Sequence, residues 1–243
     1  MSSQSLRPSS GQTDIHPIQA GILKELVFHP ERRFSELNAE GISSDQFSFH
    51  LRRLTELNLV RKTDTGYELT ATGKEFANRF DTDSPQMVLE RQAKIGVSIS
   101  CVKKDEAGKD LYLIQQRLKQ PYFGYHGFIT GKVRWGETIL ETATRELQEE
   151  TGLSASMTVS GVKHKMDYSE TGELLEDKYF FVVKAENPTG TLRDNIKGGK
   201  NAWFSEKGLL KLPDVFDGVD ETVEIIKSGV FQFVERKYTV KRY

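Results

Sequence analysis

The chain has 243 residues, of which 37% are hydrophobic and 28% are charged, and its formal net charge at pH 7 is −1. This length favours two domains, each large enough to bury a core, and the balanced charge argues against a protein that binds polyanions over its whole length. The single cysteine, Cys101, permits no internal disulfide, and neither an apolar signal core nor an apolar run long enough to cross a membrane occurs. We therefore expect a cytoplasmic protein with no membrane partner.

The first part of the chain changes character near residue 15. Residues 1–14 are rich in serine, have few apolar side chains to bury, and are predicted to form a disordered tail. Residues 15–83 are predicted to form a domain, because apolar residues recur there at helical spacing. The expected helices contain Ile18–Leu26, then Phe34–Leu37, then a stretch that begins at Ser44 or Asp45 and ends near Leu57.

A hairpin is expected after the third helix. Apolar runs at Leu59–Val60 and Tyr67–Leu69 flank the turn Thr63–Gly66, and a further short helix is expected at Gly73–Phe80. The segment Phe47–Phe76 resembles the recognition helix and wing of ArsR-like or MarR-like winged helix-turn-helix regulators.

The winged-helix resemblance implies that a local basic patch binds double-stranded DNA. Residues 1–83 carry ten basic and twelve acidic side chains, so only a patch, and not the whole domain, could meet phosphates. The residues predicted to form this patch are His50, Arg52, Arg53, Arg61 and Lys62. The alternatives are a solvated helix face, or a module for docking or oligomerisation, so a homodimer stays among the expected assemblies.

A second domain is expected at residues 92–243. Residues 84–91 are predicted to form a short linker, because the polar run Asp81–Pro85, which extends into their start, ends in proline. A β pattern then runs through Gln92–Val102 and, after a charged turn, through Leu111–Gln115. We expect these two segments to be the opening antiparallel strands of a sheet.

A strand rich in aromatic residues is expected at Tyr122–Thr130. The rings of Tyr122, Phe123 and Tyr125 could stack on a nucleobase, and packing in the core or at its rim is the alternative for each. Tyr122 and Phe123 are the candidate substrate-binding residues of this segment.

The stretch Gly131–Leu153 carries the most informative pattern. A helix from about Thr138 to Thr151 would place three carboxylates on one face, those of Glu146, Glu149 and Glu150. Like charges at this spacing repel unless a cation lies among their oxygens, and a hard divalent ion suits such a donor set. The spacing therefore predicts a site for Mg²⁺ or Mn²⁺.

Other residues of this stretch are expected to hold the acidic face in place. Arg145 lies four residues after Glu141 and four before Glu149, so its planar side chain is predicted to orient Glu149. Glu137 lies near the positive end of the helix dipole, and Gly152 is placed to end the helix in a left-handed conformation.

The stretch resembles the Nudix box, G-x5-E-x7-R-E-U-x-E-E-x-G-U, in which U is aliphatic. The fixed positions of the box are filled by Gly131, Glu137, Arg145, Glu146, Leu147, Glu149, Glu150, Gly152 and Leu153. The resemblance implies a Nudix α/β/α sandwich with a mixed sheet, and a metal-dependent hydrolase of nucleoside diphosphates linked to another group. It assigns the metal to the three carboxylates and to the carbonyl oxygen of Thr130. Catalysis is assigned to Glu149, Arg145 and Glu137.

The region after the box contributes fewer candidates. The elements expected there are strands at Met157–Val162 and Lys178–Val183, a flexible loop at Asn187–Lys200 and a final helix at Val219–Ile226. Tyr168 lies near the place where dinucleoside polyphosphate hydrolases of the Nudix family commonly carry a tyrosine, so it is a candidate for substrate binding. Asp194 and Glu206 stay open as late acidic residues.

The sequence as a whole predicts an α+β protein in which a winged helix-turn-helix domain precedes a Nudix sandwich. The predicted function is cleavage of a pyrophosphate bond in a nucleoside diphosphate-type small molecule. The alternative is a nucleotide-sensing transcriptional regulator, in which the second domain binds the effector and the first binds DNA. The two functions can coexist, although a box with every ligand position filled favours catalysis.

Overall fold

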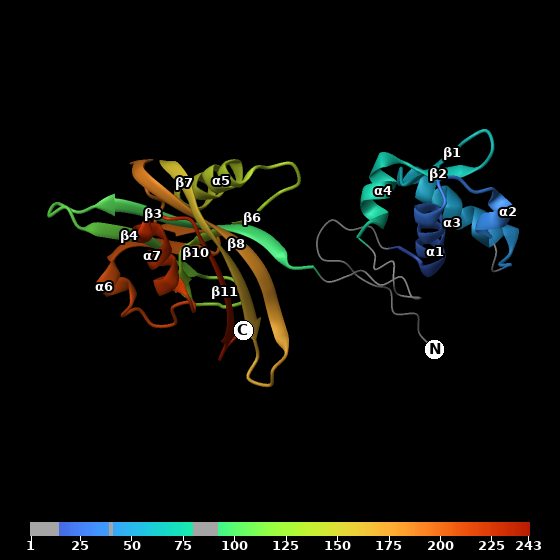
Figure 1. The fold of residues 1–243 in the computed structure, drawn as a ribbon. Helices are drawn as coiled ribbons and strands as arrows, with labels where there is room; N and C mark the ends of the chain where they lie inside the picture. Colours follow the sequence, from blue (N-terminus) through green and yellow to red (C-terminus); the bar gives the residue numbers. More distant parts are fainter. Residues whose placement is uncertain (1–14, 39–40, 80–91) are drawn as a thin grey trace. The chain divides into compact units, whose positions relative to one another are not determined.

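The computed structural model describes residues 15–38, 41–79 and 92–243 (Figure 1). The predicted tail at 1–14 and the predicted linker at 84–91 lie outside the described residues. Contacts divide the chain into two compact units, Met1–Arg91 and Gln92–Tyr243, which are considered separately. Within the described ranges, no helix has both the length and the apolar character needed to span a bilayer.

The first unit consists of short helices closed by a hairpin. Its described elements are α1 (Pro17–Phe28), α2 (Phe34–Leu37), α3 (Ser44–Glu56), β1 (Val60–Lys62), β2 (Tyr67–Leu69) and α4 (Ala71–Ala77). Nδ1 of His16 accepts a hydrogen bond from the amide of Ile18 at 3.2 Å, which caps α1. The side chain of Gln19 accepts in return from the amide of His16 at 3.0 Å, so the first turn of α1 is closed on both sides.

Apolar side chains of α1 and α3 form the centre of this unit. Leu23 of α1 and Phe47 and Leu54 of α3 are buried in one cluster with the hairpin residue Val60. The last helix of this unit begins at Ala71 and not at the predicted Gly73. The reason is that the hydroxyl group of Thr70 accepts a hydrogen bond from the amide of Gly73 at 2.9 Å, which makes Thr70 the N-cap.

The second unit is built on a nine-stranded sheet. Its strands are β3 (Lys94–Lys104), β4 (Asp110–Arg117), β5 (His126–Gly127), β6 (Ile129–Lys132), β7 (Leu153–Tyr168), β8 (Leu174–Gly190), β9 (Asn195–Ile196), β10 (Gly199–Ser205) and β11 (Gln232–Thr239). The strand order is β11-β7-β8-β3-β4-β10-β9, with β5 paired to β4 and β6 paired to β3. Because β3–β8 and β11–β7 are parallel and the other pairs are antiparallel, the sheet is mixed, as predicted.

Helices pack on both faces of this sheet (Figure 1). They are α5 (Ile139–Thr151) on one face, and α6 (Glu206–Leu209) and α7 (Val219–Ser228) on the other. The neighbouring strand residues Val183 and Val182 point to opposite faces: Val183 is buried in a cluster with Leu147 of α5, and Val182 in a cluster with Ile225 of α7. The sheet is therefore the middle layer between two apolar cores.

The prediction of a flexible loop at Asn187–Lys200 is wrong. β8 continues to Gly190 because it pairs with the start of β7, as far as Leu153. β9 and β10 then pair with each other, so only residues 191–194 lie between β8 and β9. Pairing between distant segments, which no local pattern reports, converts most of the predicted loop into strand.

Two further expectations for this unit are corrected. The single strand expected at Tyr122–Thr130 is divided into β5 and β6, and Tyr122 itself has a left-handed φ of 65°, which ends the extended conformation there. The predicted final helix, α7, is followed by the edge strand β11, which the sequence did not predict. β11 has exposed charged residues in its middle, so its pattern lacks a clear buried face.

β11 is fastened to the sheet by contacts around His164 of β7. Nδ1 of His164 lies 2.6 Å from the carboxylate of Glu235 in β11, and Nε2 lies 2.8 Å from that of Asp177 in β8. The imidazole also stacks on Tyr179, with ring centroids 4.0 Å apart. Burial lowers the pKa of His164, but the hydrogen bonds to both carboxylates outweigh this effect and raise the pKa above its usual value. A protonated imidazole therefore links three neighbouring strands.

We predict that His164 stabilises the fold in a pH-dependent way. Because its pKa is raised in the folded state, the stabilisation is complete below the unfolded value of 6.5 and is lost as the pH rises through the folded value. Urea unfolding of the wild type and of His164→Gln should give the larger difference in free energy of unfolding at about pH 6, and a smaller one at about pH 9. A difference that does not change with pH would contradict this role.

Candidate active site

The acidic face belongs to α5, which is capped at both ends. The hydroxyl group of Thr138 accepts the amide of Glu141 at 3.3 Å, and the carboxylate of Glu141 accepts the amide of Thr138 at 2.8 Å. This capping box starts the helix, and Gly152, with a φ of 76°, ends it in the predicted left-handed conformation. Ala143 and Leu147 are fully buried against the sheet, so the carboxylate face is held on a fixed support.

Arg145 is the centre of the site. Its guanidinium group donates two hydrogen bonds to Glu137, at 2.6 and 2.8 Å, one to Glu146 at 2.7 Å and one to Glu149 at 3.2 Å. A fifth hydrogen bond, at 3.2 Å, reaches the carbonyl oxygen of Lys132 in β6. The predicted link from Arg145 to Glu149 is present. Glu141 forms the helix cap, and Arg145 binds Glu137 and Glu146 in addition to Glu149.

The charges in this cluster stabilise one another. Hydrogen bonds from Arg145 are the largest cause of a lowered pKa at Glu137, which falls to about 2, and Thr142 and the amide of Arg134 add to it. The pKa of Arg145 is raised, chiefly by its hydrogen bonds to Glu137 and then by Glu146. Both groups are therefore charged at neutral pH.

Gly131 is required by close packing, and not by its backbone conformation. A Cβ atom at this position would lie 2.0 Å from the Cδ and Cγ atoms of Glu146. The side chain of Glu146 thus lies directly on the backbone of β6. An alanine would have to push the carboxylate away, so the first glycine of the box sets where Glu146 can lie.

Glu150 is held separately from the other two predicted metal ligands. Its carboxylate accepts a hydrogen bond from Nε2 of Gln115 in β4 at 3.0 Å. Asn201 of β10 accepts from the same Nε2 at 3.1 Å and donates to the carbonyl oxygen of Glu150 at 2.8 Å. The sequence did not indicate Gln115 or Asn201, because they reach α5 only through the pairing of β4 with β10.

The residues of the acidic face suit a hard divalent ion in their chemistry. All side-chain donors are carboxylate oxygens, the ligand type that Mg²⁺ and Mn²⁺ prefer. Within 15–38, 41–79 and 92–243, however, no three acidic, histidine or cysteine side chains converge on a common point. Arg145 binds Glu146 and Glu149 and Gln115 binds Glu150, so these carboxylates would have to exchange protein partners for a metal.

Two of the predicted substrate-binding residues lie outside the immediate surroundings of α5. Tyr122 is buried: its hydroxyl group donates to Asp167 at 2.8 Å and its ring packs edge-to-face against Phe216. Its ring has no free face for a nucleobase, which corrects the prediction for this residue. Tyr168 is the last residue of β7, at the opposite end of that strand from Leu153, which follows α5 directly. Phe123, by contrast, is 52% exposed.

The predicted nucleic-acid-binding residues in the first unit differ in exposure. His50 is buried, stacks on His16 at 4.2 Å between centroids, and has a pKa lowered chiefly by burial, so it cannot offer a positive charge to a phosphate. This corrects the prediction for His50. The remaining four side chains are exposed, and three of them form ion pairs within the unit. The pairs are Arg52–Glu56, Arg53–Glu56 and Arg61–Glu68.

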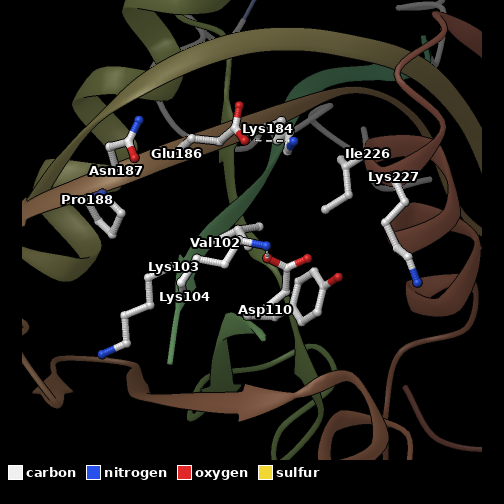
Figure 2. A pocket seen from close by; sticks show the side chains of 11 residues that line it. Val102, Lys103, Lys104, Asp110, Lys184, Glu186, Asn187, Pro188, Ile226 and Lys227 are labelled. Carbon is white, nitrogen blue, oxygen red and sulfur yellow. Dashed lines mark ion pairs between the residues drawn. The ribbon is translucent and has the colours of Figure 1, made fainter. Parts of the chain in front are cut away.

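A cavity of about 530 Å³ lies elsewhere in the second unit (Figure 2). It is lined by the last residues of β3, the first of β4, the second half of β8 and the end of α7, and four lysines are among the lining residues. Three of these lysines form ion pairs, namely Lys104–Asp110 at 2.6 Å, Lys184–Glu186 at 2.8 Å and Lys227–Glu206 at 2.8 Å. The cavity also lies at the opposite end of β3 from Gly96, which pairs beside Gly131, so we assign no role in the acidic site to it.

Comparisons with known proteins concern both units. A family model described as "NUDIX domain" matches residues 94–223, and one described as a domain of unknown function (DUF7347) matches residues 16–79. A search of curated proteins found no match.

Solved structures resemble the second unit. The MutT protein from Bacillus halodurans is 24% identical, with a TM-score of 0.51, and the match covers 62% of this chain and 93% of that one. The NUDIX domain of Shewanella oneidensis NrtR, solved with ADP ribose, is 15% identical, with a TM-score of 0.50, and the match covers 66% and 98%. At these identities the likeness concerns the fold.

We predict that the Glu137–Arg145 pair stabilises the fold except in strong acid. The pKa of Glu137 is lowered from 4.5 to about 2, so its contribution is complete above the unfolded value and is lost as the pH falls toward the folded one. Glu137→Gln should lower the free energy of unfolding at about pH 7, and the gap to the wild type should narrow below about pH 4.5. Glu106→Gln, at an exposed turn position, is the matched control and should change little. Equal effects of the two substitutions would refute the assignment.

Proposed function

Because the chain belongs to the Nudix family, whose domain model matches just over half of it, we propose that it is a divalent-metal-dependent pyrophosphohydrolase. Its substrate would be a nucleoside diphosphate joined to another group. The observation that carries this proposal is the position of Glu146 and Glu149, which one guanidinium group holds side by side on a capped helix. Such a pair is poorly explained by stability alone, since two like charges on adjacent turns repel.

Three carboxylates of α5 would hold Mg²⁺ or Mn²⁺, namely those of Glu146, Glu149 and Glu150. The ion would supply charge neutralisation at the phosphate oxygens and a lower pKa for an attacking water. The carbonyl oxygen of Thr130, which directly precedes Gly131, is a further candidate ligand.

Glu149 is the residue that we assign to proton transfer. Arg145 and Arg134 both approach its Oε2 atom, at 3.2 and 3.6 Å, so Oε1 is the oxygen that can accept a proton from water. Arg145 is a positioning residue in this scheme, and Glu137 positions Arg145 in turn through two hydrogen bonds. Phe123 and Tyr168 stay candidates for contact with more distant parts of the substrate.

A nucleotide derivative is the ligand class that we favour. The structurally similar NUDIX domain of NrtR was solved with ADP ribose, which contains a pyrophosphate between adenosine and a ribose. We infer the same general chemistry here: a pyrophosphate beside the acidic face and an organic group on each side of it.

We predict that Glu149→Gln loses most of the hydrolytic activity while the protein stays folded. Loss of a general base typically costs about 10²–10⁴-fold in rate, and loss of a metal ligand adds to this. Activity would be measured by phosphate or mononucleotide release from a panel of nucleoside diphosphate derivatives with Mg²⁺ or Mn²⁺, and folding by circular dichroism. Glu106→Gln is again the control for the charge change. Wild-type turnover by Glu149→Gln would rule out the assignment.

A second candidate function is binding of double-stranded DNA by the first unit, with the Nudix unit as the nucleotide sensor. The observation that favours it is the exposure of Arg52 and Arg53 on α3, with Arg61 and Lys62 exposed on the following hairpin strand. A helix followed by a hairpin with basic residues on both is the arrangement that a winged helix-turn-helix uses on DNA. A role of the same unit in docking or in forming a homodimer would leave DNA untouched.

We predict that the full chain shifts a DNA duplex in a gel at low salt, and that the shift weakens as salt rises because phosphate contacts release counterions. Replacing both Arg52 and Arg53 by glutamate should lower the affinity at least about tenfold. The same charge change at Lys74 and Arg79, on and just after α4, should have a smaller effect. No shift at low salt would exclude this function and favour docking or self-association, which light scattering would detect.

A further inference from the structure

Trp135 is the most exposed large apolar side chain among the described residues, with 87% of its surface accessible. Indole rings usually bury most of their area, and a free ring therefore requires an explanation. Trp135 lies in the short segment between β6 and α5, next to the acidic face.

The segment holds Trp135 in a defined turn. The amide of Glu137 donates to the carbonyl oxygen of Arg134 at 3.0 Å, and Gly136 has a φ of 85°. This combination is typical of a type II turn, in which Trp135 occupies the second position and Gly136 the third. The carboxylate of Glu137 also accepts the amide of Arg134 at 3.2 Å, so both ends of the turn are closed.

Arg145 fixes this turn to the carboxylate site from two sides. It binds the carbonyl oxygen of Lys132, before the turn, and the carboxylate of Glu137, after it. The exposure of Trp135 is therefore a property of a restrained segment and not of a free chain end. The turn that carries the indole thus lies beside the residues that we assign to pyrophosphate cleavage.

The neighbouring side chain in the turn supplies a positive charge. The guanidinium group of Arg134 lies 3.6 Å from Oε2 of Glu149 and is largely exposed. An exposed ion pair of this length is weak, typically ~0–1 kcal/mol, so Arg134 can exchange Glu149 for a phosphate oxygen. Trp135 is the next residue of the same turn, so an exposed cation near Glu149 is followed directly by an exposed aromatic ring.

We propose that Arg134 and Trp135 form a nucleotide-binding edge of the active site, in which Trp135 stacks on the base and Arg134 binds the adjoining phosphate. This proposal rests on the proposed function, because it places the diphosphate between the turn and α5. Base stacking on an aromatic side chain is tolerant of base identity, so the edge selects nucleotides as a class and not one base.

Fluorescence tests the proposal directly, because the chain has two tryptophans. Trp203→Phe leaves Trp135 as the only indole, and Trp135→Phe leaves Trp203, which has the ammonium group of Lys103 4.4 Å above its ring. Both variants would be titrated with adenosine diphosphate and, separately, with inorganic pyrophosphate. We expect adenosine diphosphate, and not pyrophosphate, to quench Trp135. Trp203 should respond to neither.

Kinetics supplies a second readout. The substrate would be a nucleoside diphosphate derivative that the wild type hydrolyses. Trp135→Ala should raise its KM about tenfold with kcat little changed, whereas Trp135→Phe, which keeps an aromatic ring, should have a KM close to that of the wild type. Arg134→Gln should weaken the binding of both adenosine diphosphate and pyrophosphate, because the phosphate is common to them.

The outcomes separate this proposal from the proposed function. Hydrolysis by the wild type together with an unquenched Trp135 and an unchanged KM in Trp135→Ala overturns the nucleotide-binding edge and leaves the hydrolase standing. Quenching of Trp135 by adenosine diphosphate without any turnover supports the edge and removes the hydrolase. Equal quenching by pyrophosphate overturns base stacking.

Discussion

The site depends on one guanidinium group among three carboxylates. Arginine has five N–H donors in a rigid plane, and Arg145 uses them in five hydrogen bonds, to Glu137, Glu146, Glu149 and the backbone of Lys132. Lysine has three donors around a single point and could not reproduce this arrangement. The same contacts that offset repulsion on α5 also attach the preceding loop to the helix. Position and charge at this site are therefore set by one side chain.

Glu150 is positioned by strands of the sheet and not by the loop that precedes α5. Gln115 and Asn201 come from adjacent strands, and both bind Glu150, one at the carboxylate and the other at the backbone. The acidic face is thus divided: Glu146 and Glu149 belong to the arginine cluster, and Glu150 belongs to the β4–β10 pair. Binding of one ion by all three carboxylates, as proposed, would require Glu146 and Glu149 to exchange Arg145, and Glu150 to exchange Gln115, for the metal.

Local patterns predicted the parts of the fold whose causes are local. The extent of α5 and the left-handed glycine that ends it both follow from spacing within about fifteen residues, which is the range of helical periodicity. Predictions failed where a partner far along the chain decides the outcome. Tyr122 is buried because Asp167 accepts its hydroxyl group, and Asn187–Lys200 is mostly strand because β7 and β4 lie beside it. Trp135 was overlooked for a different reason: exposure is a three-dimensional quantity, and a hydrophobic residue in a loop carries no sign of it.

Electrostatics alone does not decide whether the first unit can bind a polyanion such as DNA. Its net charge is slightly negative and three of its four exposed candidate cations are paired with glutamates, which at first favours a docking role. Exposed pairs of this kind are worth ~0–1 kcal/mol each, however, whereas each phosphate contact on DNA releases a condensed counterion. The glutamate partners would therefore reduce the proposed attraction to DNA without abolishing it. DNA binding would then depend on whether the spacing between α3 and the hairpin fits a groove of the duplex. This is a property of shape, which net charge does not describe.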